Sequence, residues 1–204
     1  MALSAVITAD IVNSTRLSRV ELKAIMKALT TVFAGHKIEF FRGDSFQVHV
    51  KSPAPAFQLL LLARSVTIKI SEGVSDVKAC IGIDQVMLPV KELSTAAGEA
   101  FILSGRAFDG MKAERLMVIS GEKNVVANTG LRVLSAFTDY LFSHLTAKQA
   151  VVVFEMLSGK TQTDTARKLK KSQATVHKHL QAAGWPEMEH LMKEYQLLIN
   201  VIKS

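Results

Sequence analysis

The chain has 204 residues, of which 49% are hydrophobic, and it carries 25 lysine and arginine residues against 18 acidic residues, a formal net charge of +7. This length and apolar content suit one large or two small folded domains and exclude global disorder. The single cysteine, Cys80, excludes an intramolecular disulfide framework and a four-thiolate zinc site.

The first 120 residues alternate between strand and helix patterns. Short β-branched or apolar runs predict strands, and apolar residues at helical spacing predict helices. The triplet Arg42-Gly43-Asp44 predicts a tight hairpin turn. In chain order the predicted elements are a strand over 3–9, a helix over 17–33, strands over 37–41 and 45–50, a helix from 53 to about 70, a strand over 77–83, a helical or partly looped segment over 97–111, and a strand over 116–119.

The order β-α-β-β-α-β with additions predicts an α+β fold. It is typical of a ferredoxin-like antiparallel sheet with helices on one face. Residues 121–204 have an almost wholly helical pattern, and residues 141–204 hold nine lysine and arginine residues against five acids, a net of +4. We therefore expect two domains that pack together, a ferredoxin-like domain over residues 1–140 and a small helical domain over residues 141–204.

Two carboxylates fall at related places in the predicted sheet. Asp10 follows the first strand, and Asp44 lies in the hairpin between the second and third strands. Because the first and third strands of a ferredoxin-like sheet are neighbours, the two side chains can converge and hold Mg²⁺ together with substrate phosphates. Backbone N–H groups from Ile11 to Ser14 can cradle a phosphate. In the alternative interpretation, Asp10 only caps the next element and Asp44 is only a turn residue.

These residues carry a family resemblance. Residues 9–15 (ADIVNST) resemble the first metal-binding segment of class III nucleotide cyclases, and Gly43-Asp44 resembles their second metal aspartate. Residues 81–84 resemble their fourth core strand, and residues 98–106 resemble the helix that carries their transition-state residues. The resemblance covers roughly residues 3–120. It implies metal ligation by Asp10 and Asp44 and nucleotide contacts by Asn13, Ser14 and Arg106.

The same helix departs from the cyclase pattern. Ile102 stands where active cyclases keep an asparagine, and it cannot donate a hydrogen bond. Loss of one donor to a developing oxyanion costs about 10²–10³ in rate. The resemblance therefore implies ligand binding without catalysis, and Arg106 has the alternative of a surface ion pair with Glu99 or Asp109.

The C-terminal third predicts a helix-turn-helix. Thr146 is the expected N-cap of a helix that ends at residues 158–160. Helices over 162–169 and about 173–183 are separated by the turn 170–172, with Ala166 at their close approach. A last helix over 186–202 carries an apolar stripe that either completes the core or forms a dimer seam.

This region also carries a resemblance. Residues 163–166, Leu169 and residues 172–176 resemble the bacterial helix-turn-helix, and Leu145, Thr146 and Gln149 resemble sigma-factor region 4 and response-regulator output domains. Lys170 takes the place of the usual turn glycine. The whole chain is similar to the SatD-like bacterial proteins, which join a cyclase-like domain to a helix-turn-helix.

The resemblance implies double-stranded DNA as the partner. Glutamine can recognise adenine, lysine guanine, and the methyl groups of alanine or threonine can contact thymine. Lysine, arginine and serine near the turn suit phosphates, which fix register without reading sequence. The expected base contacts are Gln173, Thr175, His177 and Lys178, and the expected phosphate contacts are Arg167, Lys170, Lys171 and Ser172. The alternative is a helical domain that binds another protein.

The leading hypothesis is a homodimeric DNA-binding regulator with a ligand-sensing or dimerising N-terminal domain. The competing hypothesis is a Mg²⁺-dependent phosphoryl-transfer enzyme that uses Asp10 and Asp44. The longest apolar run, residues 57–63, is too short for the roughly 20 residues that span a bilayer. The N-terminus lacks a basic leading stretch. We therefore expect a cytoplasmic protein without a membrane partner.

Overall fold

The computed structural model describes residues 2–41 and 43–203, so Arg42 of the predicted hairpin turn lies outside the described residues. The fold is α+β, with one five-stranded sheet and eight α-helices in the described chain. The strands are β1 (Ala2–Ile11), β2 (Lys37–Phe41), β3 (Ser45–Val50), β4 (Val77–Val86) and β5 (Leu116–Ser120). The helices are α1 (Arg19–Val32), α2 (Ala56–Ile70), α3 (Glu99–Gly110), α4 (Val125–Ser143), α5 (Ala147–Leu157), α6 (Gln162–Leu169), α7 (Gln173–Ala182) and α8 (Trp185–Lys203), and a 3-10 turn, η1 (Ser14–Arg16), precedes α1.

The sheet has the strand order β2-β3-β1-β4-β5. The pairs among the first four strands are antiparallel, as predicted, but β5 pairs with β4 in parallel. The expectation of a purely antiparallel sheet is therefore wrong at this edge. Parallel neighbours need a crossover connection, and the segment between β4 and β5, which contains α3, provides it.

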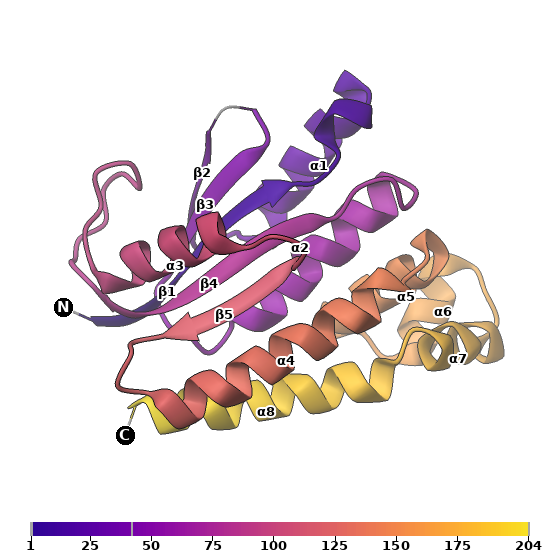
Figure 1. The fold of residues 1–204 in the computed structure, drawn as a ribbon. Coiled ribbons are helices and arrows are strands. Elements are labelled where there is room, and N and C mark those ends of the chain that lie inside the picture. Colours follow the sequence, from indigo (N-terminus) through magenta and orange to yellow (C-terminus); the bar gives the residue numbers. More distant parts are fainter. Residues whose placement is uncertain (1, 42, 204) are drawn as a thin grey trace.

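Helices cover both faces of the sheet, which corrects the prediction of helices on one face (Figure 1). Ala5 and Ile7 belong to the core cluster that includes α1 and α2. Val6 and Thr8 point the other way, toward α3, where the Thr8 hydroxyl donates to Ser104 Oγ at 3.0 Å. Gly82 permits this close approach, because a Cβ there would lie 2.5 Å from the Ala100 carbonyl oxygen.

The C-terminal helices share the core of the sheet. α5 packs against α2, α7 packs against α5 and α6, and α8 lies along α4 (Figure 1). The Tyr195 hydroxyl on α8 donates to the Pro53 carbonyl before α2, at 2.8 Å. The expected boundary between residues 140 and 141 falls within α4.

The apolar stripe of the last helix completes the core. Its members are either buried or partly buried against the core cluster, so the stripe does not provide a free dimer seam. Trp185, at the start of the helix, is buried as well. The buried members of the stripe are Met188, Leu191, Tyr195 and Ile199.

Local signals place several helix ends. Thr146 caps α5 through a reciprocal capping box with Gln149, as its sequence predicts. Ser18 forms the same arrangement with Glu21 at α1, which begins two residues later than expected. Val20 is 79% exposed, although its spacing predicts a core position.

Within residues 2–41 and 43–203, no helix has both the length and the apolar character needed to cross a bilayer.

A buried arginine joins α2 to its neighbours. The Arg64 guanidinium is 1% exposed and donates to Asp76 and to Asp139, each at 2.7 Å. It also lies 4.4 Å from the centre of the Phe142 ring. Because Asp76 precedes β4 and Asp139 lies on α4, this ion-pair network connects the sheet, α2 and α4.

Candidate functional site

The short turn between α6 and α7 contains one left-handed residue. Lys170 ends α6 with φ 52° and ψ 44°, the left-handed region that usually selects glycine. The next amide, Lys171 N, donates to the Ala166 carbonyl at 3.0 Å. Ser172 then caps α7, where its hydroxyl accepts from Thr175 N at 3.1 Å. The predicted short turn over residues 170–172 is therefore present between two helices, with lysine in the left-handed position.

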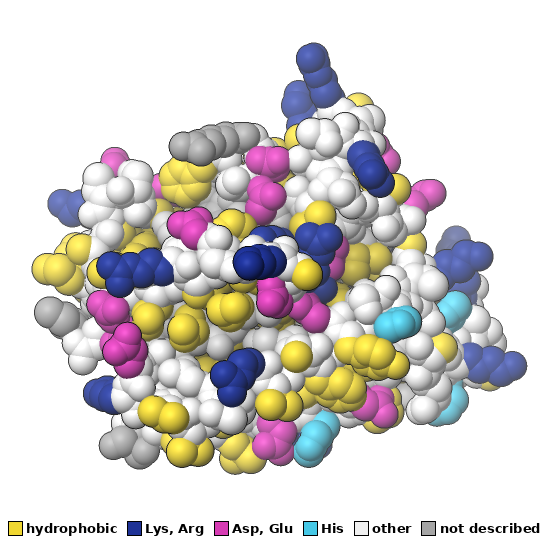
Figure 2. All heavy atoms as spheres, viewed as in Figure 1, with side chains coloured by type: hydrophobic (Ala, Val, Ile, Leu, Met, Phe, Trp, Pro, Cys, Tyr) yellow, Lys and Arg dark blue, Asp and Glu magenta, His cyan; other side chains and the backbone are white. Residues whose placement is uncertain are grey.

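One face of α7 is buried and the other is free. Val176 and Leu180 pack inward against α5 and α6. The outward face of the described helix presents Gln173, Ala174, His177 and Lys178, all exposed. Figure 2 shows histidine, lysine and arginine side chains over the end of the molecule where Figure 1 places α6 and α7. The residues expected to contact bases are thus accessible, with Thr175 half-buried at the edge.

The cations near the turn differ in what they contact. Lys170, Lys171 and Lys178 are exposed and form no ion pair with any other described residue. Arg167 is exposed but lies 3.4 Å from Asp164, so part of its charge is neutralised locally. Lys168 binds Glu155, a 1% exposed carboxylate on α5, at 2.7 Å. The three unpaired lysines are therefore the cations most available to an anionic partner.

Two hydroxyls expected to face DNA are partly used within the cap. Ser172 Oγ and Thr175 Oγ1 lie 2.8 Å apart, and Ser172 Oγ also accepts from the Thr175 amide. Since either oxygen can donate in this contact, one of the two hydroxyl protons remains free. The Ser172 oxygen caps α7, so a phosphate contact by Ser172 uses its hydroxyl proton as the donor.

The two carboxylates of the N-terminal region converge. Asp10, near the end of β1, is paired in register with Ser45, the residue that follows Asp44. The Ser45 hydroxyl donates to Asp10 at 3.1 Å, and the Ser14 hydroxyl donates to Asp44 at 2.6 Å. The neighbouring positions of β1 and β3 produce this convergence, as the predicted topology requires.

Asp10 is electrostatically strained. Burial, followed by the negative charge of Asp44, raises its pKa above the ordinary value, while the Ser45 hydrogen bond and Lys78 oppose the shift. Lys78 lies opposite Asp10 on β4, and its ammonium donates to the Met111 carbonyl at 2.8 Å. A cation would relieve the repulsion between the two carboxylates, and Lys78 supplies part of that relief.

The predicted phosphate cradle is partly occupied by the fold. The amide of Ile11 donates to the Asp44 carbonyl and that of Val12 to the Asp76 carbonyl. Asn13 adopts φ 57° and its side chain donates to the Val74 carbonyl at 3.1 Å. The Ser14 hydroxyl donates to the Asp44 carboxylate. Two of the four expected amides are therefore unavailable, because the chain uses them to hold the end of β1.

Arg106 lies on the exposed side of α3. Among the described residues it pairs with neither Glu99 nor Asp109, so the ion-pair alternative is wrong. Ile102, one turn earlier, is 43% exposed. α3 thus presents a free guanidinium without the polar neighbour that the cyclase pattern requires.

Sequence reasoning missed Lys78 and Ser45 as partners of Asp10. Their roles depend on strand register, which places them on either side of Asp10. A signal was present for Ser45, since it directly follows Asp44. For Lys78, no local pattern distinguishes a lysine beside a carboxylate from one on a solvated strand.

The donors suit a hard cation only in part. Asp10 and Asp44 supply carboxylate oxygens, which Mg²⁺ prefers. In the part of the chain that the structure describes, however, no group of three or more histidine, cysteine or acidic side chains is arranged to hold a metal. Comparison of the chain with protein-family models and with curated proteins finds no match.

Proposed function

We propose that this protein is a cytoplasmic DNA-binding regulator whose α7 lies in the major groove of a duplex. The observation that carries the proposal is the exposed face of α7, with Gln173, His177 and Lys178 outward and unpaired lysines at the turn before it. In this proposal residues 141–204 act as the helix-turn-helix domain and residues 1–140 as a ferredoxin-like, cyclase-like domain, the arrangement of SatD-like proteins.

Base and phosphate contacts divide along the segment. Gln173 at the start of α7 suits adenine, and Lys178 one and a half turns later suits guanine. Thr175 and His177 complete the base-facing set. The unpaired Lys170 and Lys171 hold backbone phosphates, with smaller contributions from Arg167 and Ser172, whose polar atoms are partly engaged.

We propose a homodimer that forms through α4. Four apolar side chains on one side of this helix remain exposed, at spacings close to a heptad. A second copy packed on this stripe would bury it, and DNA binding by such a two-fold dimer requires recognition helices roughly 34 Å apart. Sedimentation of wild-type protein and of Val133→Glu tests this interface, because a charge at the centre should give monomer. The stripe consists of Val126, Val133, Phe137 and Tyr140.

Selection of bound DNA from a random duplex pool, followed by affinity measurements across salt concentrations, tests the main proposal. The two phosphate-binding lysines, Lys170 and Lys171, contribute a salt slope of about −0.9 each, and Lys178 is the expected base contact. Changing all three to glutamate should therefore lose about a hundredfold or more in affinity. The matched control changes Lys23, Lys27 and Lys112 to glutamate, which alters net charge equally on exposed positions elsewhere. Absence of salt-sensitive binding in the parent protein would refute the proposal.

The convergence of Asp10 and Asp44 favours a second candidate, Mg²⁺-dependent nucleotide binding or phosphoryl transfer. The two carboxylates would take two coordination positions, and water and nucleotide phosphate the others. Calorimetry with ATP or GTP plus Mg²⁺ should then show binding that Asp10→Ala abolishes and Asp109→Ala preserves. No heat of binding in the parent protein would leave the carboxylates with a structural role.

A further inference from the structure

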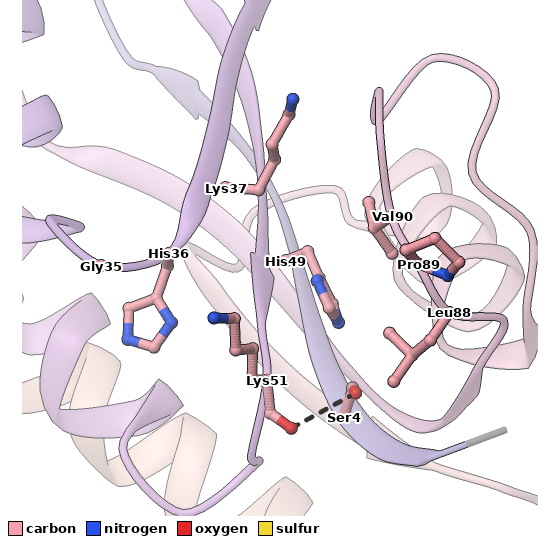
Figure 3. A pocket seen from close by; sticks show the side chains of 9 residues that line it. All are labelled: Ser4, Gly35, His36, Lys37, His49, Lys51, Leu88, Pro89 and Val90. Carbon is pink, nitrogen blue, oxygen red and sulfur yellow. Dashed lines mark hydrogen bonds between the residues drawn. The ribbon is translucent and has the colours of Figure 1, made fainter.

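A cavity lies at the opposite end of the sheet from Asp10 and Asp44. It has a volume of about 510 Å³ and lies between the start of β1, the end of β3 and the segment that follows β4 (Figure 3). Ser4 and Asp10 are six residues apart on β1, so the two sites are separated by about 20 Å along the strand. The cavity is therefore independent of the carboxylate pair.

The cavity contains a buried imidazole with an unused nitrogen. His49 is only 4% exposed, and its Nε2 has no hydrogen-bond partner among the described residues. Nδ1 of His36, half-buried on the loop before β2, is also unpartnered within the same part of the chain. Buried polar atoms nearly always have partners, because leaving them unsatisfied is unfavourable. Two such atoms lining one cavity indicate a polar ligand.

The charge of the lining is positive. In Figure 3 the ammonium of Lys51 points toward the His36 ring, and the lining residues of the described chain include no carboxylate. Burial, and then the nearby positive charges, lower the pKa of both imidazoles. Lys37 points away, bound to the Lys91 carbonyl and paired with Glu39 at 3.6 Å. Lys51 therefore remains as an unpaired cation, which favours an anionic group.

The opposite wall is apolar. Leu88 is 56% exposed, Pro89 is exposed and Val90 is half-buried, and all three line the cavity. The Phe101 ring stacks on His49, with 6.4 Å between ring centres, and fixes the imidazole from behind. Exposed apolar side chains beside a cation and two imidazoles suit a molecule with one charged end and one apolar end.

We propose that this cavity binds a small organic anion, with its carboxylate or phosphate against Lys51, His36 and His49 and its apolar part on residues 88–90. Ser4 adds a hydroxyl to the polar side, where it already reaches the Lys51 carbonyl at 3.4 Å. The proposal extends beyond DNA recognition, since it assigns the N-terminal region a ligand site, and it stands whether or not α7 binds DNA.

Titration of the full chain, followed through the histidine ring resonances in NMR spectra, tests the site. The probes are 3-methylbutanoate and phenyl phosphate, with 3-methylbutanamide as the neutral counterpart of the first. Either anion should shift the His36 and His49 resonances saturably, while His190 on α8, which lies 3.7 Å from Glu194, remains unmoved as an internal control. The tighter of the two anions identifies the preferred charged group.

Lys51→Met should weaken binding about tenfold, as expected for loss of one charge-assisted contact. Lys112→Met, at an exposed lysine after α3 at the other end of the sheet, should bind as the parent does. Because Lys51 is exposed and forms no ion pair within the described chain, the variant should keep its fold, which its melting temperature checks. Equal shifts with the neutral amide, no saturation with either anion, or unchanged binding in Lys51→Met would each overturn the proposal.

Discussion

Two sets of cations in this molecule have opposite surroundings. The Arg64 guanidinium is buried between Asp76 and Asp139, each of its three nitrogens donates to a carboxylate, and the Phe142 ring lies 4.4 Å away. Lys170, Lys171 and Lys178 stand in solvent and pair with no described residue. The first arrangement holds helices and sheet together, whereas the second leaves charge available to a partner. The difference separates basic residues that serve stability from those that can serve recognition.

The largest expected effect is on the buried pair network. Arg64→Met leaves two carboxylates without their cation, and breaking a buried ion pair costs about 3–5 kcal/mol. Urea unfolding measures the loss in the free energy of unfolding. Arg132→Met, at an exposed position on α4, is the control and should change stability by less than about 0.5 kcal/mol. Equal effects in both variants would contradict a structural role for the network.

Lys171→Ala tests the role of the exposed, unpaired lysines. An exposed unpaired lysine adds little to folding, so the melting temperature should remain that of the parent. DNA affinity should fall by about tenfold at low salt for every duplex, and the salt slope should decrease by about 1. Fluorescence anisotropy at several salt concentrations measures both. A variant that loses stability instead would place Lys171 with the structural cations.

Lys170→Gly should stabilise the protein. The left-handed conformation at φ 52° disfavours any residue with a Cβ, and glycine relieves about 1 kcal/mol of that strain. Lys171→Gly, at a position without positive φ, should give no such gain. Thermal melts measure both variants, and Lys170→Gly should have the higher melting temperature. A higher melting temperature for Lys171→Gly would contradict the left-handed conformation at Lys170.

The smallest effect concerns Asp10. Because burial and Asp44 raise its pKa in the folded state, the folded protein binds the proton more tightly than the unfolded chain does. Stability is therefore lost as pH rises from the unfolded value near 3.8 through the higher folded value. Asp10→Asn should melt higher than the parent at pH 7 without divalent cations, and the gain should vanish in acid. Asp109→Asn, on an exposed carboxylate, should show no such pH dependence, and a lower melting temperature for Asp10→Asn would contradict the repulsion.

Local chemistry made much of the fold predictable. The bounds of β2, β3 and α6 coincide with the predicted ranges, because turns and caps mark their ends. The approach of Asp10 to Asp44 followed from the expected strand neighbours. The parallel pairing of β5 did not follow, since a short apolar strand carries no mark of its direction.

The sequence alone did not predict contacts between residues that lie far apart along the chain. Arg64 interrupts an apolar helix and resembles a residue that reaches solvent, yet its partners lie 12 and 75 positions away. The burial of the unpaired His49 nitrogen likewise depends on where the fold places the segment after β4. In both cases the surroundings, and not the residue type, decide the role.

The contact between α8 and the start of α2 has a practical consequence. Besides the Tyr195 hydroxyl, the Gln196 side chain donates to the Ala54 carbonyl at 2.7 Å, 142 residues away in the chain. A protease that nicks the exposed connection at His144 would therefore produce two fragments that stay associated. They would migrate as one particle on a sizing column and separate only in denaturant.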